Sequence, residues 1–369
     1  MLRAPALGIL FLALVPTSAS PFLQDQSDAA SAEIELRTAT ELTRKGRFAD
    51  AIPHFLAADG RVSASDENAL HFNLALCYVG TSQFGKAIQT IEQLKSSGVD
   101  NDGVENLLAQ SYIGNGQNRE AFRAVQRAAS FAPKNEKLYT LVSDACMDRK
   151  DFALGLQVVD LGLQHLPKSA RLHYQRAYFL VVLDQWDSAQ SEFDLAARLA
   201  PHSEIAYLAQ VQKFKYAGDL TGQVRVGREA VQEGQANFQV LAILGDALIA
   251  SGAVPGQPEF TEAEAVLTKA VEERPQFAGA QLSLGSLLLQ ENRIDAAIQR
   301  LEIARSLDPA NVTVYSRLAV AYRRVGRKEA ADQALATLAD LNSRLEKEIR
   351  SAPGDRKAIM GGGESSPHP

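Results

Sequence analysis

Small and apolar residues recur along this chain with a period of about 34 residues. Nine positions share the same local pattern, and eight of them hold alanine or glycine. These anchors are Ala51, Ala87, Ala121, Gly155, Ala189, Gln223, Ala263, Ala297 and Ala331. Most anchors have a further small residue twelve positions earlier and another seven positions later. Two helices approach closely only where the facing side chains are small. Each anchor therefore predicts one pair of antiparallel helices.

Polar and turn-forming residues mark the ends of these helices in register with the anchors. Five units carry a proline twelve residues after the anchor, where it ends the second helix: Pro133, Pro167, Pro201, Pro275 and Pro309. Most first helices follow a serine or asparagine, a side chain that caps a helix start. These caps are Ser31, Asn101, Asn135, Ser169, Ser203, Asn237 and Asn311, with Glu67 and Phe277 as exceptions. Turn glycines that allow a positive φ are Gly46, Gly116, Gly218, Gly252 and Gly326.

This pattern resembles the tetratricopeptide repeat, a helix–turn–helix unit of about 34 residues. Segments 106–133 and 284–309 match it most fully. The first has Leu-Leu-Ala at 107–109, Glu-Ala-Phe at 120–122, Ala128 and Pro133; the second has Leu-Gly at 284–285, Ala-Ala-Ile at 296–298 and Asp-Pro at 308–309. The resemblance implies an all-α fold, a right-handed superhelical solenoid of about nine repeats that covers residues 32–343.

The ends of the chain depart from the repeat pattern. Arg3, the apolar run Ala4–Val15 and the small residues after it predict a secretory signal peptide, cleaved after Ala19. A retained anchor or a disordered amino terminus is the alternative. The predicted layout is a signal peptide at 1–19, a linker at 20–31, the repeat array at 32–343, a capping helix extension at 344–350 and a disordered tail at 351–369.

Two repeats differ from the rest. The sixth has Gln223 at its anchor and carries Gly222 and Gly227, which lower helix propensity, so we predict the weakest joint of the array there. The seventh carries an insertion at 253–258, which we predict to form a loop between its helices.

Charge and cysteine content narrow the possible functions. Lys and Arg number 38 against 44 Asp and Glu, a net charge of −6, which argues against a strongly basic nucleic-acid-binding protein. The two cysteines, Cys77 and Cys146, argue against a disulfide-rich scaffold, and we predict buried thiols. We expect no membrane span in the mature chain and a periplasmic or secreted location.

Motifs for chemistry are largely missing from the sequence. No His-Glu-x-x-His or Cys-x-x-Cys spacing occurs, so we predict no metal site, no cofactor and no catalytic residue. His165, His173 and His202 fall near neighbouring repeat junctions, but surface or packing roles are favoured over a metal site. The repeats also leave no room for a separate catalytic domain.

The family resemblance implies that the first helices line a concave groove that binds a protein or peptide. The predicted groove residues are Phe72, Leu76, Gln110, Ile113, Asp144, Tyr174, Tyr178, Gln212, Lys215 and Asp246. Tyr174 and Tyr178 stand one helical turn apart and could form an aromatic shelf. The clamp for acidic carboxyl-terminal peptides known in the family is missing, because its first-repeat positions here hold Leu36 and Thr40.

These observations predict a non-catalytic protein–protein interaction scaffold, exported from the cytoplasm. The alternative is a structural or assembly subunit of a bacterial envelope or secretion complex. An enzyme with an unrecognised site is a third, less favoured reading.

Overall fold

The computed structural model describes residues 21–351, in which all regular secondary structure is α-helical. The chain divides into two compact units, residues 1–131 and 132–369. The first unit contains α1 (Pro21–Arg44), α2 (Phe48–Ala58), α3 (Ala64–Gly80), α4 (Phe84–Ser96), α5 (Asp102–Gly114) and α6 (Asn118–Phe131).

The second unit contains the remaining twelve described helices. They are α7 (Glu136–Arg149), α8 (Phe152–His165), α9 (Ala170–Val182), α10 (Trp186–Leu199), α11 (Glu204–Tyr216), α12 (Leu220–Gln232), α13 (Phe238–Ala250), α14 (Pro258–Glu273), α15 (Ala278–Gln290), α16 (Ile294–Leu307), α17 (Val312–Arg324) and α18 (Lys328–Ser351).

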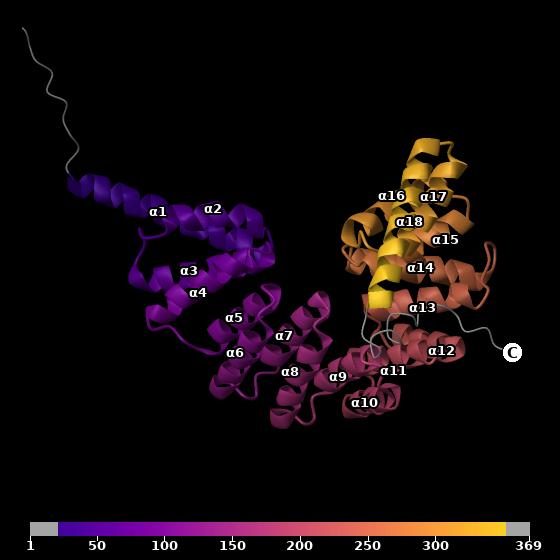
Figure 1. The fold of residues 1–369 in the computed structure, drawn as a ribbon, viewed down its shortest axis with the longest axis horizontal. Helices are drawn as coiled ribbons and strands as arrows, with labels where there is room; N and C mark the ends of the chain where they lie inside the picture. The colour runs from indigo at the N-terminus through magenta and orange to yellow at the C-terminus, as the bar shows by residue number, and fades with distance from the viewer. Residues whose placement is uncertain (1–20, 352–369) are drawn as a thin grey trace, which may run out of the picture. The chain divides into compact units, whose positions relative to one another are not determined.

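Each odd-numbered helix packs against the even-numbered helix that follows it, so the nine predicted helix pairs are present (Figure 1). We call the odd-numbered helices first helices and the even-numbered ones second helices. All nine anchor residues are buried, as close helix contacts require. At Gly155 a Cβ atom would lie 2.3 Å from Cζ of Phe179, so only glycine fits between α8 and α9 there.

Within each unit, successive first helices also contact one another, as α7, α9, α11, α13, α15 and α17 do in the second unit. The second helices of successive pairs lie farther apart in the described part of the chain. A stack whose members are closer on one side curves toward that side. The first helices therefore form the inner face of each unit.

Most predicted caps are confirmed by hydrogen bonds. The side chains of Asn101, Ser169, Ser203, Asn237 and Asn311 each accept a hydrogen bond from a backbone N–H group in the first turn that follows. The predicted starts of the first two first helices, α1 and α3, were wrong. α1 begins at Pro21 and runs through Ser31, so residues 21–31 are helical and not a linker. α3 is capped by Ser63, whose Oγ accepts from Asp66 N, and not by Glu67.

A hydrogen bond recurs six residues after several closing prolines of the second unit. The hydroxyl groups of Tyr139 and Tyr315 donate to the carbonyls of Pro133 and Pro309, both at 2.9 Å. Gln281 Nε2 donates to the Pro275 carbonyl at 2.8 Å, and His173 Nε2 lies 3.1 Å from the Pro167 carbonyl. This proline clasp joins the first helix of one repeat to the end of the preceding repeat.

The departures from the pattern are accommodated without breaking the array. α12 is continuous, and Gly222 and Gly227 are buried where a Cβ would lie 2.4 Å from Phe214 and 2.9 Å from Leu244. The insertion forms the connection between α13 and α14, with Ala253 buried and Val254 exposed. Residues 344–350 continue α18, which ends at Ser351. The predicted signal peptide and residues 352–369 of the predicted tail lie outside the described residues.

None of the helices described between residues 21 and 351 has the combination of length and apolar character that a bilayer span requires.

Candidate functional site

The ten predicted groove residues belong to two different units. Four of them, Phe72, Leu76, Gln110 and Ile113, lie in the first unit. The other six, Asp144, Tyr174, Tyr178, Gln212, Lys215 and Asp246, lie on the first helices of the second unit. One prediction in the first unit is wrong: Ile113 is fully buried, so its side chain is part of the core and not of a binding surface.

The second unit brings its six residues together with four that sequence reasoning missed. We call this set the inner strip. It consists of Asp144 and Asp148 on α7, Arg171, Tyr174, Gln175 and Tyr178 on α9, Gln212, Lys215 and Tyr216 on α11, and Asp246 on α13. Contacts between α7 and α9, α9 and α11, and α11 and α13 place these helices side by side.

The aromatic shelf predicted at Tyr174 and Tyr178 is only partly correct. The ring of Tyr174 is 7% exposed and lies 6.1 Å from the ring of Phe193 on α10, so it is mainly a core residue. Tyr178 is half-buried, and Tyr216 is 38% exposed and stacks on Phe193 at 6.2 Å. The accessible aromatic surface of the strip therefore comes from Tyr178 and Tyr216.

Hydrogen bonds connect the strip across its helices. Gln175 Nε2 donates to Asp144 Oδ1 at 2.7 Å, which ties α9 to α7. Gln212 on α11 hydrogen-bonds to the Tyr174 hydroxyl on α9. Ser283 on α15 hydrogen-bonds to the Asp246 carboxylate on α13. The strip is thus a continuous polar surface and not a set of isolated side chains.

The acidic groups of the strip are destabilised in their charged form. Desolvation raises the pKa of Asp144, although the charge of Arg171 and the hydrogen bond from Gln175 act to lower it. Desolvation is the one cause that raises the pKa of Asp148. It also raises the pKa of Asp246, although Ser283 and Lys215 act in the other direction. Burial raises the pKa of Tyr174 to about 12. Clusters of such shifts are common at binding sites.

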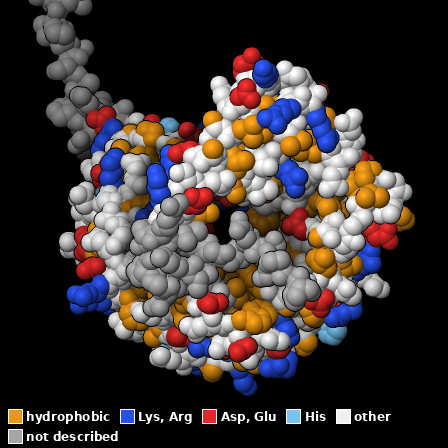
Figure 2. Space-filling model, turned by 45° about the vertical axis from the view of Figure 1, so that its right-hand side comes forward, with side chains coloured by type: hydrophobic (Ala, Val, Ile, Leu, Met, Phe, Trp, Pro, Cys, Tyr) orange, Lys and Arg blue, Asp and Glu red, His pale blue; other side chains and the backbone are white. Residues whose placement is uncertain are grey.

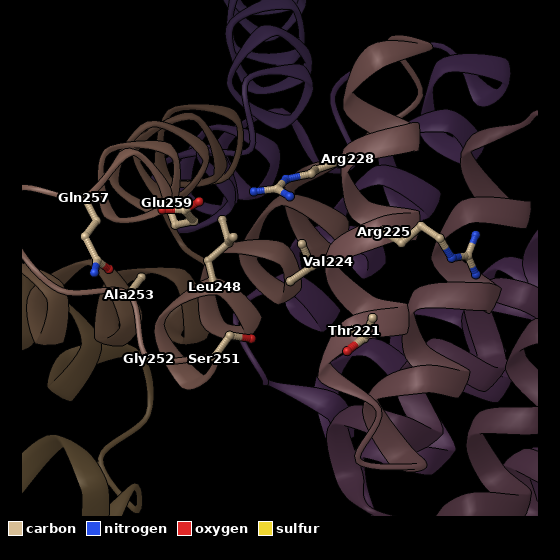
Figure 3. A pocket seen from close by; sticks show the side chains of 10 residues that line it. All are labelled: Thr221, Val224, Arg225, Arg228, Leu248, Ser251, Gly252, Ala253, Gln257 and Glu259. Atoms are coloured by element: carbon tan, nitrogen blue, oxygen red, sulfur yellow. The ribbon is translucent and has the colours of Figure 1, made fainter.

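A pocket of about 670 Å³ lies between α12 and the connection from α13 to α14. Val224 and Leu248 supply apolar surface, and Arg225 and Arg228 extend from α12 (Figure 3). Both arginines already have carboxylate partners: Arg228 pairs with Glu262 at 2.6 Å, and Arg225 pairs with Glu229 at 3.0 Å. The predicted insertion thus forms one wall of a pocket in which the charges are balanced.

One group of residues in the first unit has side chains suited to a metal ion. The ligand atoms of Asp59, Glu67 and His71 lie within 4.8 Å of one another. His71 Nε2 lies 3.0 Å from Asp59 Oδ1, and Gly60 N donates to Glu67 Oε1 at 3.0 Å. The imidazole and the amide therefore already engage both carboxylates. Sequence reasoning missed this group, because Asp59 follows the end of α2 and the other two residues lie on α3.

The first unit also contains a buried acid that is paired with two cations. Glu105 on α5 is fully buried, and it forms ion pairs with Lys95 on α4 and with Arg127 on α6, the latter at 2.8 Å. Burial acts to raise the pKa of Glu105, but hydrogen bonds from Arg127 and Lys95 outweigh it, so the pKa is lowered. We call these three residues the Glu105 network.

The prediction of buried thiols is confirmed: both cysteines are free and fully buried. Burial raises the pKa of Cys146 to about 12, which makes this thiol unreactive at neutral pH. The three histidines near repeat junctions each have a separate partner. His173 Nδ1 pairs with Glu192, His202 pairs with Glu233, and the His165 ring stacks on Tyr139.

Comparison with known proteins agrees with the repeat pattern. A family model described as tetratricopeptide repeat matches residues 257–306 and 288–344. Residues 257–344 therefore consist of tetratricopeptide repeats. Among solved structures, the Cut9–Hcn1 hetero-tetramer of the APC/C has a TM-score of 0.51 at 15% identity, covering 78% of this chain and 55% of that one. This likeness shows that the tetratricopeptide-repeat fold extends well beyond the two matched segments.

Two further similar proteins have different descriptions. The human IFIT1 dimer with m7Gppp-AAAA has a TM-score of 0.51 at 15% identity, covering 76% of this chain and 71% of that one. The mitochondrial import receptor subunit TOM70 of Homo sapiens is 27% identical over 169 residues, 44% of this chain. The tetratricopeptide-repeat chain spans only 27% of that receptor's length. The fold alone therefore does not decide what this chain binds.

The surface of this chain is mixed in charge on the face that Figure 2 presents. On the face that Figure 2 presents, acidic and basic side chains are scattered among hydrophobic and neutral ones, without a continuous basic area. Because no single charge dominates that face, the identity of a partner has to be argued from particular residues.

Proposed function

We propose that this chain is a non-catalytic interaction scaffold whose inner strip binds a peptide segment of a protein partner. The tetratricopeptide-repeat fold supports binding over catalysis, since such repeats stack into extended concave surfaces. The observation that carries the proposal is the inner strip itself. It combines accessible tyrosine surface on α9 and α11 with carboxylates on α7 and α13 whose pKa values are raised, and these four first helices are neighbours.

We further propose that the scaffold is exported. The support is the residue order of the first 20 positions: a positive charge, an apolar run too short to span a bilayer, and small residues after it.

A fusion of residues 1–30 to a reporter that is active only outside the cytoplasm tests this proposal. Activity is expected with the native run, and its loss is expected when Leu10 and Leu12 are changed to Arg. Retention of the native fusion in the cytoplasm would contradict export.

A random dodecapeptide phage library, panned on the purified chain, tests the binding function. We expect enriched peptides that bind at micromolar dissociation constants. A Tyr178→Ala, Tyr174→Phe double variant should weaken this binding about tenfold or more, because it removes accessible ring area and one hydroxyl group. Tyr174→Phe keeps the ring that packs on Phe193, which Tyr174→Ala would not.

The control is Phe131→Ala, which removes an exposed aromatic ring outside the strip and should leave peptide binding unchanged. No enrichment from the library would contradict the proposed function. Co-purification of the double variant in a large envelope complex, with peptide binding missing, would favour an assembly subunit. A capped RNA oligonucleotide serves as a further probe, and its binding is not expected.

A further inference from the structure

His173 is a buried histidine whose two ring nitrogens both face hydrogen-bond acceptors. The residue lies on α9 and is 8% exposed. Its Nδ1 lies 2.5 Å from Oε2 of Glu192 on α10, and its Nε2 lies 3.1 Å from the carbonyl oxygen of Pro167. A neutral imidazole carries one N–H group and can donate to only one of these oxygens. The two contacts together therefore require either a charged, doubly protonated ring or a protonated Glu192.

The surroundings of Glu192 decide where the proton lies. Arg176, three residues after His173, donates to Glu192 Oε1 at 2.6 Å and to Oδ1 of Asp160 on α8 at 2.7 Å. Burial acts to raise the pKa of Glu192, but the hydrogen bond with His173 and the charge of Arg176 outweigh it, so the pKa is lowered. The hydrogen bond with Glu192 raises the pKa of His173, against the effect of burial. The carboxylate is therefore ionised, and the ring of His173 carries the charge.

Charged residues on the other two helices that contact α9 have partners of their own. Glu136 on α7 accepts a hydrogen bond from the Ser169 hydroxyl at 2.5 Å. Lys213 on α11 pairs with Asp194 on α10 at 2.7 Å. The charge on His173 therefore depends on Glu192 and on the neighbouring Arg176.

The proline clasp at His173 differs in its chemistry from the other three. Tyr139 and Tyr315 donate through hydroxyl groups, and Gln281 donates through an amide. Tyrosine hydroxyl groups and amides keep their protons between about pH 6 and pH 9, whereas histidine titrates near neutral pH. A rise in pH therefore acts on the clasp at His173 and leaves the other three donors unchanged.

The helix that this clasp holds carries part of the inner strip. Tyr174, Gln175 and Tyr178 all follow His173 on α9, and Gln175 ties this helix to Asp144 on α7. When the ring of His173 loses one proton, it can no longer donate to both the Glu192 carboxylate and the Pro167 carbonyl. One of the two contacts at the start of α9 is then lost.

We infer that His173 is a pH-responsive joint, which holds α9 and its part of the inner strip in place while the ring is charged and loosens them when the ring loses its proton. Because the pKa of His173 is raised in the folded chain, its contribution to stability is fully present below the unfolded value of about 6.5 and is lost as the pH rises through the folded value. Peptide binding should therefore weaken as the pH rises. This effect on binding rests on the proposed function, whereas the joint itself does not.

NMR of the full chain with isotope-labelled histidine tests the charge on the ring directly. The resonances of His173 are assigned by their loss in His173→Gln. They should keep the pattern of a doubly protonated ring at a pH where the histidines of the urea-unfolded chain are already neutral. A neutral His173 ring at about pH 7 would overturn the inference.

Hydrogen exchange between about pH 6.5 and pH 9 tests the joint. After correction for intrinsic rates, residues 167–178 should lose protection at least about fivefold as the pH rises, while the segments at the other three clasps keep theirs. His173→Gln places the donor of the Gln281 clasp at this position and should remove the pH dependence. Glu192→Gln should move the loss of protection to lower pH, because an amide does not stabilise the charged ring as a carboxylate does.

His54→Gln is the matched control. His54 Nδ1 also lies 2.5 Å from a carboxylate oxygen, Oε2 of Glu35, but this pair lies in the first unit. The variant should leave the pH dependence of residues 167–178 unchanged. Circular dichroism and thermal unfolding confirm that each variant is folded. A pH dependence of these residues that persists in His173→Gln would overturn the inference.

Peptide binding at about pH 6.5 and pH 8.5 tests the effect on the inner strip. The probe is the tightest-binding peptide from the panned library, acetylated at its amino terminus and chosen without histidine or cysteine, so that it does not titrate in this range. The dissociation constant of the parent chain should rise at least about threefold between the two pH values. That of His173→Gln should stay constant.

The outcomes separate this inference from the proposed function. Equal affinities of the parent chain at the two pH values would overturn the regulation of the strip and leave peptide binding in place. Selection of no peptide at all would overturn the proposed function. The NMR and hydrogen-exchange results would then decide on the joint alone.

Discussion

The Glu105 network of the first unit buries an acid completely, whereas the inner strip of the second leaves Asp144 half-buried and Asp246 exposed, and the pKa values of these acids shift in opposite directions. Glu105 has two cations at hydrogen-bonding distance, and its pKa is lowered. Asp144 and Asp246 each have one cation nearby, and their pKa values remain raised. The first arrangement stabilises the fold, whereas the second opposes it at neutral pH. The difference separates an acid whose charge is balanced inside the fold from acids whose charge is not.

Glu105→Ala should give the largest loss of stability. The substitution leaves Lys95 and Arg127 without their shared partner in a partly buried site. We expect a loss of about 3 kcal/mol in the free energy of unfolding, measured by urea denaturation. Glu41→Ala, which removes an exposed pair with Lys45, is the control and should cost less than about 0.5 kcal/mol. Similar losses for the two variants would mean that the Glu105 network does not stabilise the first unit.

Acid should affect the two regions in opposite directions. A lowered folded pKa means that Glu105 contributes stability above its unfolded pKa, and this contribution is lost as the pH falls through the folded value. The acids of the strip have raised folded values, so their cost is relieved as the pH falls. Hydrogen exchange of the full chain, corrected for intrinsic rates, should show α5 losing protection as the pH falls below about 5, where an unfolded glutamate begins to take up a proton. Retained protection in α5, or its earlier loss in α9 and α13, would contradict the comparison.

Asp246→Asn should have the smallest effect on stability, and in the favourable direction. The amide removes a charge that is disfavoured in the folded state and can still accept the hydrogen bond of Ser283. We expect a free energy of unfolding equal to the parent's or slightly higher, while binding of the selected peptides weakens. A clear loss of stability would show that Asp246 has a structural role like that of Glu105.

Much of the fold follows from the sequence because its signals are local. The anchors, the caps at Asn101 and Ser169 and the turn glycine Gly116 act within one helix pair, and the structure places them as predicted. The start of α1 at Pro21 was missed because Ser31 resembles an N-cap residue. The first helix was therefore expected to begin after Ser31, although it continues through this residue.

The site was harder to predict because its determinants are long-range. Gln175 meets Asp144 across 31 residues, and Arg127 meets Glu105 across 22 residues, so no local spacing indicates either contact. Ile113 shares the helical phase of groove positions, yet it is fully buried. The repeat pattern predicts which helices face inward, but only packing decides which inward side chains remain accessible.

The proline clasp has a consequence for how such an array can change in length. Tyrosine, histidine and glutamine all fill the same position and all reach the same carbonyl, so the joint between repeats depends on the reach of a donor and not on one residue type. Deleting the residues between one proline clasp and the next would place the side-chain donor of one repeat next to the proline carbonyl of another, where the same hydrogen bond can form. Duplication or loss of whole repeats can thus proceed without redesigning the junctions, and partner specificity can diverge in one repeat while its neighbours are copied unchanged.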